Sequence, residues 1–99
     1  MRDYELVVIV SPEVIDEKIS NVVDKVTGFI TSKGGNVTEV SQWGRRKLAY
    51  PIGQYLEGNY VLTRFKLEPK VTKEIKANLH LSNEVIRHLL VRTPEGEKS

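Results

Sequence analysis

The spacing of apolar residues changes repeatedly along this chain, from the two-residue period of a strand to the three- or four-residue period of a helix and back. Residues 4–10 (YELVVIV) are rich in β-branched side chains and predict a strand. From Ile15 to Ile30 the apolar residues recur every three or four positions, which predicts a helix with one buried stripe. Gly34-Gly35 is expected to end this helix, because glycine accepts the left-handed conformation found there.

The rest of the chain continues the alternation between strand and helix. Residues 59–67 (NYVLTRFKL) alternate between the two faces of a strand, and 53–58 (GQYLEG) are expected to form the hairpin connection before it. Pro69 suits the first position of a second helix. A long polar strand with a bulge at Gly44 is expected over 37–50, and a last strand over 85–92. One domain over residues 1–93 and a disordered tail over 94–99 are therefore predicted.

The resulting order is strand, helix, strand, strand, helix, strand, which defines an α+β fold of the ferredoxin-like βαββαβ type. Right-handed crossovers put both helices on one face of a four-stranded antiparallel sheet and leave its other face open. A chain of 99 residues is long enough to bury a core without staples, and the absence of cysteine excludes disulfides and thiolate metal sites. The longest apolar run, Leu6 to Val10, is too short to span a membrane, and no signal peptide is expected.

The open face of this sheet is expected to carry more apolar residues than a solvated face should. The residues assigned to it are Asp3, Glu5, Val7 and Ile9 of the first strand and Tyr60, Leu62, Arg64 and Lys66 of the third. In the fourth strand, the residues on this face are either Arg87, Leu89 and Val91 or Ile86, His88 and Leu90. The sequence does not decide which set it is, so the register of this strand is not assigned. A mixed apolar, aromatic and arginine patch is typical of an interface, although a small sheet can also tolerate one without a partner.

Positive charge is concentrated in the second part of the chain. Residues 36–92 hold ten basic and five acidic side chains, whereas residues 1–35 hold four and six. The run Arg45-Arg46-Lys47 on an extended strand can neutralise phosphates on both of its sides, and Tyr50 offers a flat face to an unstacked base. Charged residues also protect an edge strand from aggregation, so charge alone does not decide between these two roles.

The segment 44–52 (GRRKLAYPI) resembles the signature of the bacterial small-ribosomal-subunit protein six family. Met1-Arg2 followed by Tyr4-Glu5, Gly58-x-Tyr60 and Val85-x-Arg87 match in the same order, so the resemblance spans roughly residues 1–93. It implies a cytoplasmic, non-enzymatic constituent of the small ribosomal subunit, without cofactor or metal. It further implies binding to small-subunit ribosomal RNA together with ribosomal small-subunit protein eighteen during assembly.

The resemblance also implies roles for individual residues. RNA contacts are implied at Arg2, Arg46, Tyr50 and Arg87, and Arg45 and Lys47 are added because they complete the cation run. Contacts with the partner protein are implied at Tyr60 and Leu62, with Arg64 and Leu89 expected beside them on the open face. Asp3 stands where many relatives carry a cation.

Three other functions are compatible with the same order of elements. An RNA-recognition-motif domain stacks bases on two aromatics of its third strand, but here Tyr60 and Phe65 have opposite parity. An acylphosphatase-like hydrolase needs a glycine-rich phosphate-binding loop before the start of a helix, whereas Gly34-Gly35 follows the end of a helix. The two histidines, His80 and His88, are also isolated in the sequence. A metabolite-sensing regulatory domain that dimerises through the open sheet face would self-associate without RNA.

Overall fold

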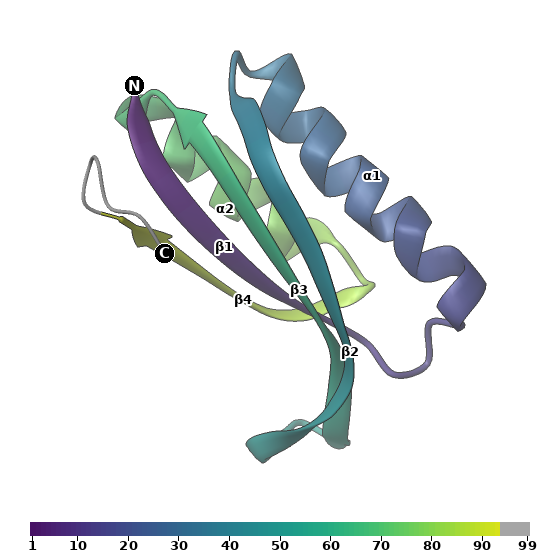
Figure 1. Cartoon of the computed structure of the whole chain (residues 1–99). Helices are drawn as coiled ribbons and strands as arrows, with labels where there is room; N and C mark the ends of the chain where they lie inside the picture. Colours follow the sequence, from purple (N-terminus) through teal and green to yellow (C-terminus); the bar gives the residue numbers. More distant parts are fainter. Residues whose placement is uncertain (94–99) are drawn as a thin grey trace.

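The computed structural model describes residues 1–93 as one four-stranded antiparallel sheet with two helices packed against one face (Figure 1). Its elements are β1 (Arg2–Val10), α1 (Asp16–Ser32), β2 (Asn36–Ile52), β3 (Tyr55–Leu67), the short 3-10 helix η1 (Pro69–Val71), α2 (Thr72–Leu81) and β4 (Val85–Arg92). The strand order β2-β3-β1-β4 confirms the ferredoxin-like fold. The tail expected over residues 94–99 lies outside the described residues.

The core lies between the sheet and the helices. Its sheet side consists of the residues predicted for it, Tyr4, Leu6, Val8 and Val10 of β1 with Val61, Thr63, Phe65 and Leu67 of β3, all at most 7% exposed. The two sets coincide in one layer because paired residues of neighbouring strands share a face. Ile19, Val22, Val26 and Ile30 of α1 and Ile75 and Leu79 of α2 cover this layer. Full burial of one such side chain stabilises the fold by about 1.5–3 kcal/mol.

Glycine ends α1 as expected. Gly34 has a φ of 88°, and the N–H of Gly35 donates to the carbonyl oxygen of Ile30 over 2.9 Å. This bond satisfies a carbonyl group that the helix end would otherwise leave unpaired, and it turns the chain into β2. Pro69 begins the 3-10 helix η1, not α2 itself, which follows directly at Thr72, so the prediction that Pro69 opens the second helix was three residues early.

Pairing with β1 settles which residues of β4 lie on the open face. Val7 pairs with Leu89 and Ile9 pairs with Arg87, so Leu89 and Arg87 share the open side with these two residues. His88 pairs with Val8 and therefore faces the helices. An irregularity between Ile9 and Val10 shifts the register at the start of β4, an adjustment that alternation of residue types does not reveal.

The hairpin between β2 and β3 is longer than the sequence predicts. Only Gly53 and Gln54 form the turn, and β3 already begins at Tyr55, so the predicted connection over 53–58 was wrong. The bulge predicted at Gly44 is present, with a φ of 85° and a register shift beside it. Further shifts occur toward both ends of β2. Because bulges increase local twist, the hairpin extends past the ends of β1 and β4 and bends away from the sheet plane (Figure 1).

Candidate nucleic-acid and protein interface

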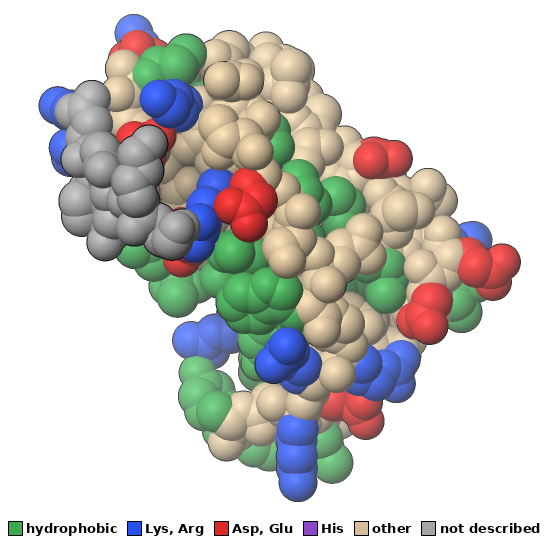
Figure 2. Space-filling view, in the orientation of Figure 1, with side chains coloured by type: hydrophobic (Ala, Val, Ile, Leu, Met, Phe, Trp, Pro, Cys, Tyr) green, Lys and Arg blue, Asp and Glu red, His purple; other side chains and the backbone are tan. Residues whose placement is uncertain are grey.

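Strand pairing orders the open face into three rows that run across β3, β1 and β4. The middle row is apolar and consists of Leu62, Val7 and Leu89. Leu62 is only 6% exposed, whereas Leu89 on the outer strand is 58% exposed. Figure 2 shows hydrophobic side chains gathered over the middle of this face, with Lys and Arg side chains toward the hairpin end. The row is therefore a partly covered apolar surface with one largely exposed leucine, Leu89.

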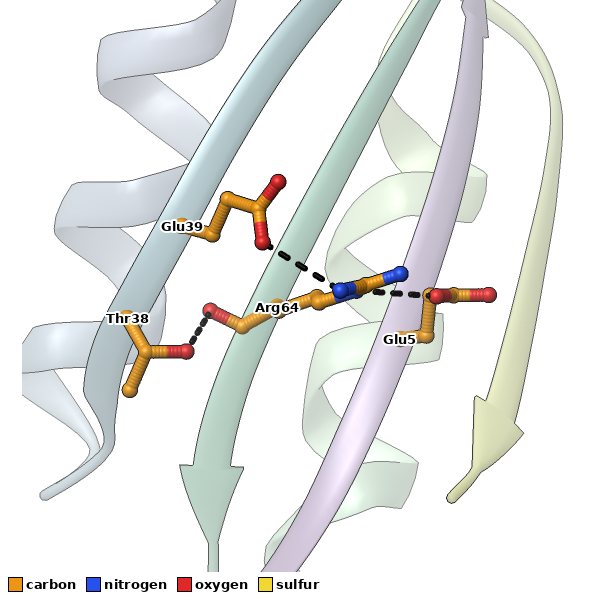
Figure 3. A network of polar contacts seen from close by, with 4 residues as sticks. All are labelled: Glu5, Thr38, Glu39 and Arg64. Atoms are coloured by element: carbon orange, nitrogen blue, oxygen red, sulfur yellow. Dashed lines mark hydrogen bonds and ion pairs between the residues drawn. The ribbon is translucent and has the colours of Figure 1, made fainter. Parts of the chain in front are cut away.

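A charged row lies on one side of the apolar row and is held together by Arg64. Its Nε donates to Glu5 Oε2 over 3.0 Å, and its Nη1 donates to Glu39 Oε1 over 3.3 Å (Figure 3). The carbonyl oxygen of Arg64 accepts a hydrogen bond from Thr38 Oγ1 over 3.1 Å. One guanidinium thus links β1, β3 and β2. Arg64, predicted as a partner-protein contact, also has a structural role within the sheet.

An aromatic stack occupies the other side of the apolar row, near the hairpin. The rings of Trp43 and Tyr60 stack with centroids 6.4 Å apart and an angle of 11° between their planes. The guanidinium carbon of Arg46 lies 5.6 Å from the centre of the Trp43 ring. Trp43 is 43% exposed, so part of its ring remains available to a ligand. Trp43 was not among the predicted contact residues, although it is the chain's single tryptophan and lies directly before Gly44 and the cation run.

The three consecutive cations of β2 differ in their surroundings. Arg45 is exposed but bound by the chain itself, because its Nη2 donates to the carbonyl oxygen of Pro12 over 2.9 Å and its Nη1 lies 3.5 Å from Glu57 Oε1. Arg46 rests on the Trp43 ring. Lys47 is exposed and forms no hydrogen bond or ion pair among residues 1–93. Lys47 and Arg46 are therefore more accessible to phosphate than Arg45.

Bending of the hairpin brings the two outer strands into contact. The guanidinium carbon of Arg87, on β4, lies 5.4 Å from the ring centre of Tyr50, on β2. The hairpin passes close over β1 at Gly58, where a Cβ atom would lie 2.4 Å from Ile9 Cγ2. A side chain at Gly58 would push the hairpin away from the sheet. The glycine thus permits the approach that joins Tyr50 to Arg87.

The predicted RNA-binding residues do not all gather in one place. Arg46, Tyr50 and Arg87 lie around the hairpin end of the open face, whereas Arg45 and Lys47, which pair with Asn59 and Glu57, lie on the other side of the hairpin. Arg2 starts β1 and pairs with Leu67, whereas Arg87 pairs with Ile9 near the other end of the strand. Seven residues of extended chain separate Arg2 from Ile9, which corresponds to about 23 Å. Arg2 is therefore a separate position.

Catalytic and metal chemistry have little support in this arrangement. Among residues 1–93 no group of three or more His, Cys, Asp or Glu side chains could hold a metal ion. Neither helix in this part of the chain is long and apolar enough to cross a membrane. What the site offers is an apolar sheet face, exposed aromatic rings and cations, which are the groups that bind proteins and nucleic acids.

Fold and site together define a small ferredoxin-like α+β domain with one helical face, one open sheet face and a basic aromatic hairpin. The model of the family described as Ribosomal protein S6 matches residues 3–92, and the chain belongs to this family. It is 44% identical to the small ribosomal subunit protein bS6 of Moorella thermoacetica, over 96% of this chain and 97% of that protein. The bS6 protein of Dehalococcoides mccartyi strain 195 is 43% identical, over 96% and 87%.

Solved structures agree with this assignment. The crystal structure of 30S ribosomal protein S6 from Thermotoga maritima superposes with a TM-score of 0.88 at 30% identity, covering 93% of this chain and 87% of that chain. The C-terminal domain of the MgtC protein from Mycobacterium tuberculosis has a TM-score of 0.63 at 12% identity, which shows a shared fold alone. As a member of the S6 family, the chain is a component of the small ribosomal subunit, a cytoplasmic particle, and not an enzyme.

Proposed function

We propose that this protein binds small-subunit ribosomal RNA together with ribosomal small-subunit protein eighteen during assembly of the subunit. Membership of the S6 family supports a role inside the particle. The observation that carries the proposal is the adjacency of two different surfaces on one face. The row of Leu62, Val7 and Leu89 offers a partly covered apolar contact. Arg87 lies in the next row, and Arg46 of the hairpin lies in the row after that.

On the RNA side, Arg46 and Lys47 neutralise phosphates, which provides most of the affinity and makes it depend on salt. Tyr50 and Arg87, which contact each other in the free protein, provide a flat face and a charge at the same edge. Arg45 adds charge and holds the hairpin to the loop after β1 through Pro12. Arg2 provides a separate contact at the far end of β1.

On the protein side, the partner covers the open face. Leu89 can bury the most additional surface when the partner binds, because 58% of its surface is exposed in the free protein. Leu62 and Tyr60 form the floor of the contact, since both are already partly or mostly covered by their neighbours. Arg64 lies at the rim, where the partner meets a guanidinium already paired with Glu5. Apolar centre and polar rim are the usual anatomy of a protein interface.

The RNA half of the proposal is tested by the salt dependence of binding. The double variant Arg46→Gln/Lys47→Gln is compared with wild type on small-subunit ribosomal RNA, in the presence of saturating protein eighteen. Loss of two phosphate contacts should make the slope of log K against log salt less negative by about two units. The control Lys18→Gln/Lys25→Gln removes two charges from α1 and should leave the slope unchanged. Equal slopes for all three proteins would exclude the hairpin as the RNA site.

A further inference from the structure

A row of basic side chains follows α2 on the flank that faces β4. Lys73, Lys76 and His80 are spaced three and four residues apart, so they lie along one side of the helix. The only acidic residue of α2, Glu74, lies on another flank, where its Oε1 is 2.8 Å from Nζ of Lys33 on α1. The side of α2 that faces away from α1 is therefore uniformly basic.

The neighbouring strand adds to this charge. His88 and Arg92 pair with Val8 and Tyr4, two core residues, so both face the helices rather than the open side of the sheet. The sequence of β4 contains no acidic residue. His80 and His88 line the same pocket of about 360 Å³, together with Leu79 and Val85. We refer to Lys73, Lys76, His80 and His88 as the α2–β4 strip.

The charges of the strip are not compensated within the described part of the chain. The pKa of His88 is lowered, first by burial and then by the positive charges of His80 and Lys76, which face it from α2. Val8, opposite His88 on β1, carries no charge, and Glu84, just before β4, binds Lys25 instead. Among residues 1–93, Lys76, His80 and His88 form no hydrogen bond or ion pair. Clustered like charges of this kind are the electrostatic footprint of a polyanion-binding surface.

We propose that the α2–β4 strip is a second RNA-binding site, which takes phosphate groups of the RNA backbone. The proposal rests on the proposed function, because it requires that the protein binds RNA. The strip lies on the helical side of the sheet, whereas Arg46 of the hairpin and Arg87 lie on the open side. Figure 1 shows α2 behind the sheet and the hairpin extending beyond its end, so one molecule could contact two RNA segments. Phosphate next to His88 favours its charged form, so this contact strengthens as the pH falls.

The test measures binding of small-subunit ribosomal RNA by the full chain with saturating protein eighteen, between 50 and 200 mM salt. The variant Lys73→Gln/Lys76→Gln should have a slope of log K against log salt that is less negative by about 1.8 units, so its loss of affinity relative to wild type shrinks about twelvefold across this range. The control Lys18→Gln on α1 should behave as wild type, because Lys18, unlike Lys25, is not paired with Glu84 beside the strip. Lowering the pH from 7.5 to 5.5 should strengthen RNA binding by wild type more than binding by His88→Gln, and an equal effect in both proteins would contradict a phosphate contact at His88.

A second measurement separates RNA from free phosphate as the ligand. Inorganic phosphate alone is titrated while the imidazole resonances of His80 and His88 are followed by nuclear magnetic resonance. An altered RNA slope in Lys73→Gln/Lys76→Gln supports the second site. An unchanged slope overturns it, and phosphate-induced shifts would then indicate a site for free phosphate only. If Arg46→Gln/Lys47→Gln loses RNA binding while the strip variant does not, the second site fails and the proposed function stands.

Discussion

The guanidinium of Arg87 lies over the ring of Tyr50 at 5.4 Å, although these residues belong to opposite outer strands of the sheet. The contact exists because the β2–β3 hairpin bends across the end of β1, where Gly58 leaves room for it. It favours a position of the hairpin close to the open face. The two proposed binding surfaces are therefore held near each other in the free protein.

The energy of this contact can be measured by a double-mutant cycle in urea unfolding. Arg87→Gln and Tyr50→Leu are made singly and together, and a coupling of about 0.5–1 kcal/mol is expected for an exposed cation–π pair. If the free energies of the single variants add without coupling, the guanidinium and the ring do not interact in solution.

Arg64 should contribute to stability as well as to the surface. Arg64→Met keeps much of the aliphatic stem but leaves Glu5 and Glu39 without their shared cation, so a loss of about 1–2 kcal/mol is expected. Lys66→Met is the control, because Lys66 lies 3.9 Å from Asp3 in a more exposed pair and should cost less than about 0.5 kcal/mol. Equal unfolding midpoints for the two variants would contradict a structural role of Arg64.

Two glycines should respond to alanine with opposite signs. Gly58→Ala places a Cβ 2.4 Å from Ile9 Cγ2 and should destabilise the protein by about 1–3 kcal/mol. Gly28 lies in α1, where an added Cβ would meet nothing within 4 Å, so Gly28→Ala should stabilise by about 0.5–1 kcal/mol. Thermal unfolding of both variants measures the difference, and a neutral Gly58→Ala would mean that the hairpin does not approach β1 closely.

Protonation of His88 should lower the free energy of unfolding as the pH falls. The folded protein holds the pKa of His88 below its ordinary value, so the unfolded chain takes up the proton more readily. Stability is therefore complete above the unfolded value of about 6.5 and is lost as the pH falls through it toward the lower folded pKa. Urea midpoints at pH 7.5 and pH 5.0 should differ more in wild type than in His88→Gln. An equal difference in both proteins would assign the pH effect to other groups.

The fold could largely be predicted from the sequence because strand and helix periods are clear in the segments that form the core. Alternation in β1 and β3 assigned the helix-facing core correctly, from Tyr4 through Leu67, but it did not predict that Ile9 and Leu62 on the open face are also buried. The start of β3 was missed because Gly58 suggested a turn, whereas it permits a close approach between two strands. The register of β4 was left open because both of its faces carry apolar residues, and only pairing with β1 decides between them.

The sequence predicted many of the residue types that make up the site, but it did not predict which of these residues contact each other. The sequence indicated the cations of β2, but which of them is held by the chain itself depends on tertiary structure, as the bond from Arg45 to Pro12 shows. The stack of Trp43 on Tyr60 depends on the bulge at Gly44, which sets the register of β2 against β3. The contact between Tyr50 and Arg87 depends on the bend of the hairpin, for which no local pattern exists.

The most direct test of the interface asks whether the open face, rather than the helical face, takes the partner protein. Isothermal titration of protein eighteen compares Leu89→Asp with Leu81→Asp, two exposed leucines, 58% and 79% exposed, on β4 and at the end of α2. Burying a charge at the centre of an interface is costly, so Leu89→Asp should weaken binding by at least about tenfold while Leu81→Asp binds as wild type. Full affinity in Leu89→Asp, with loss in Leu81→Asp, would contradict the assignment of the open face.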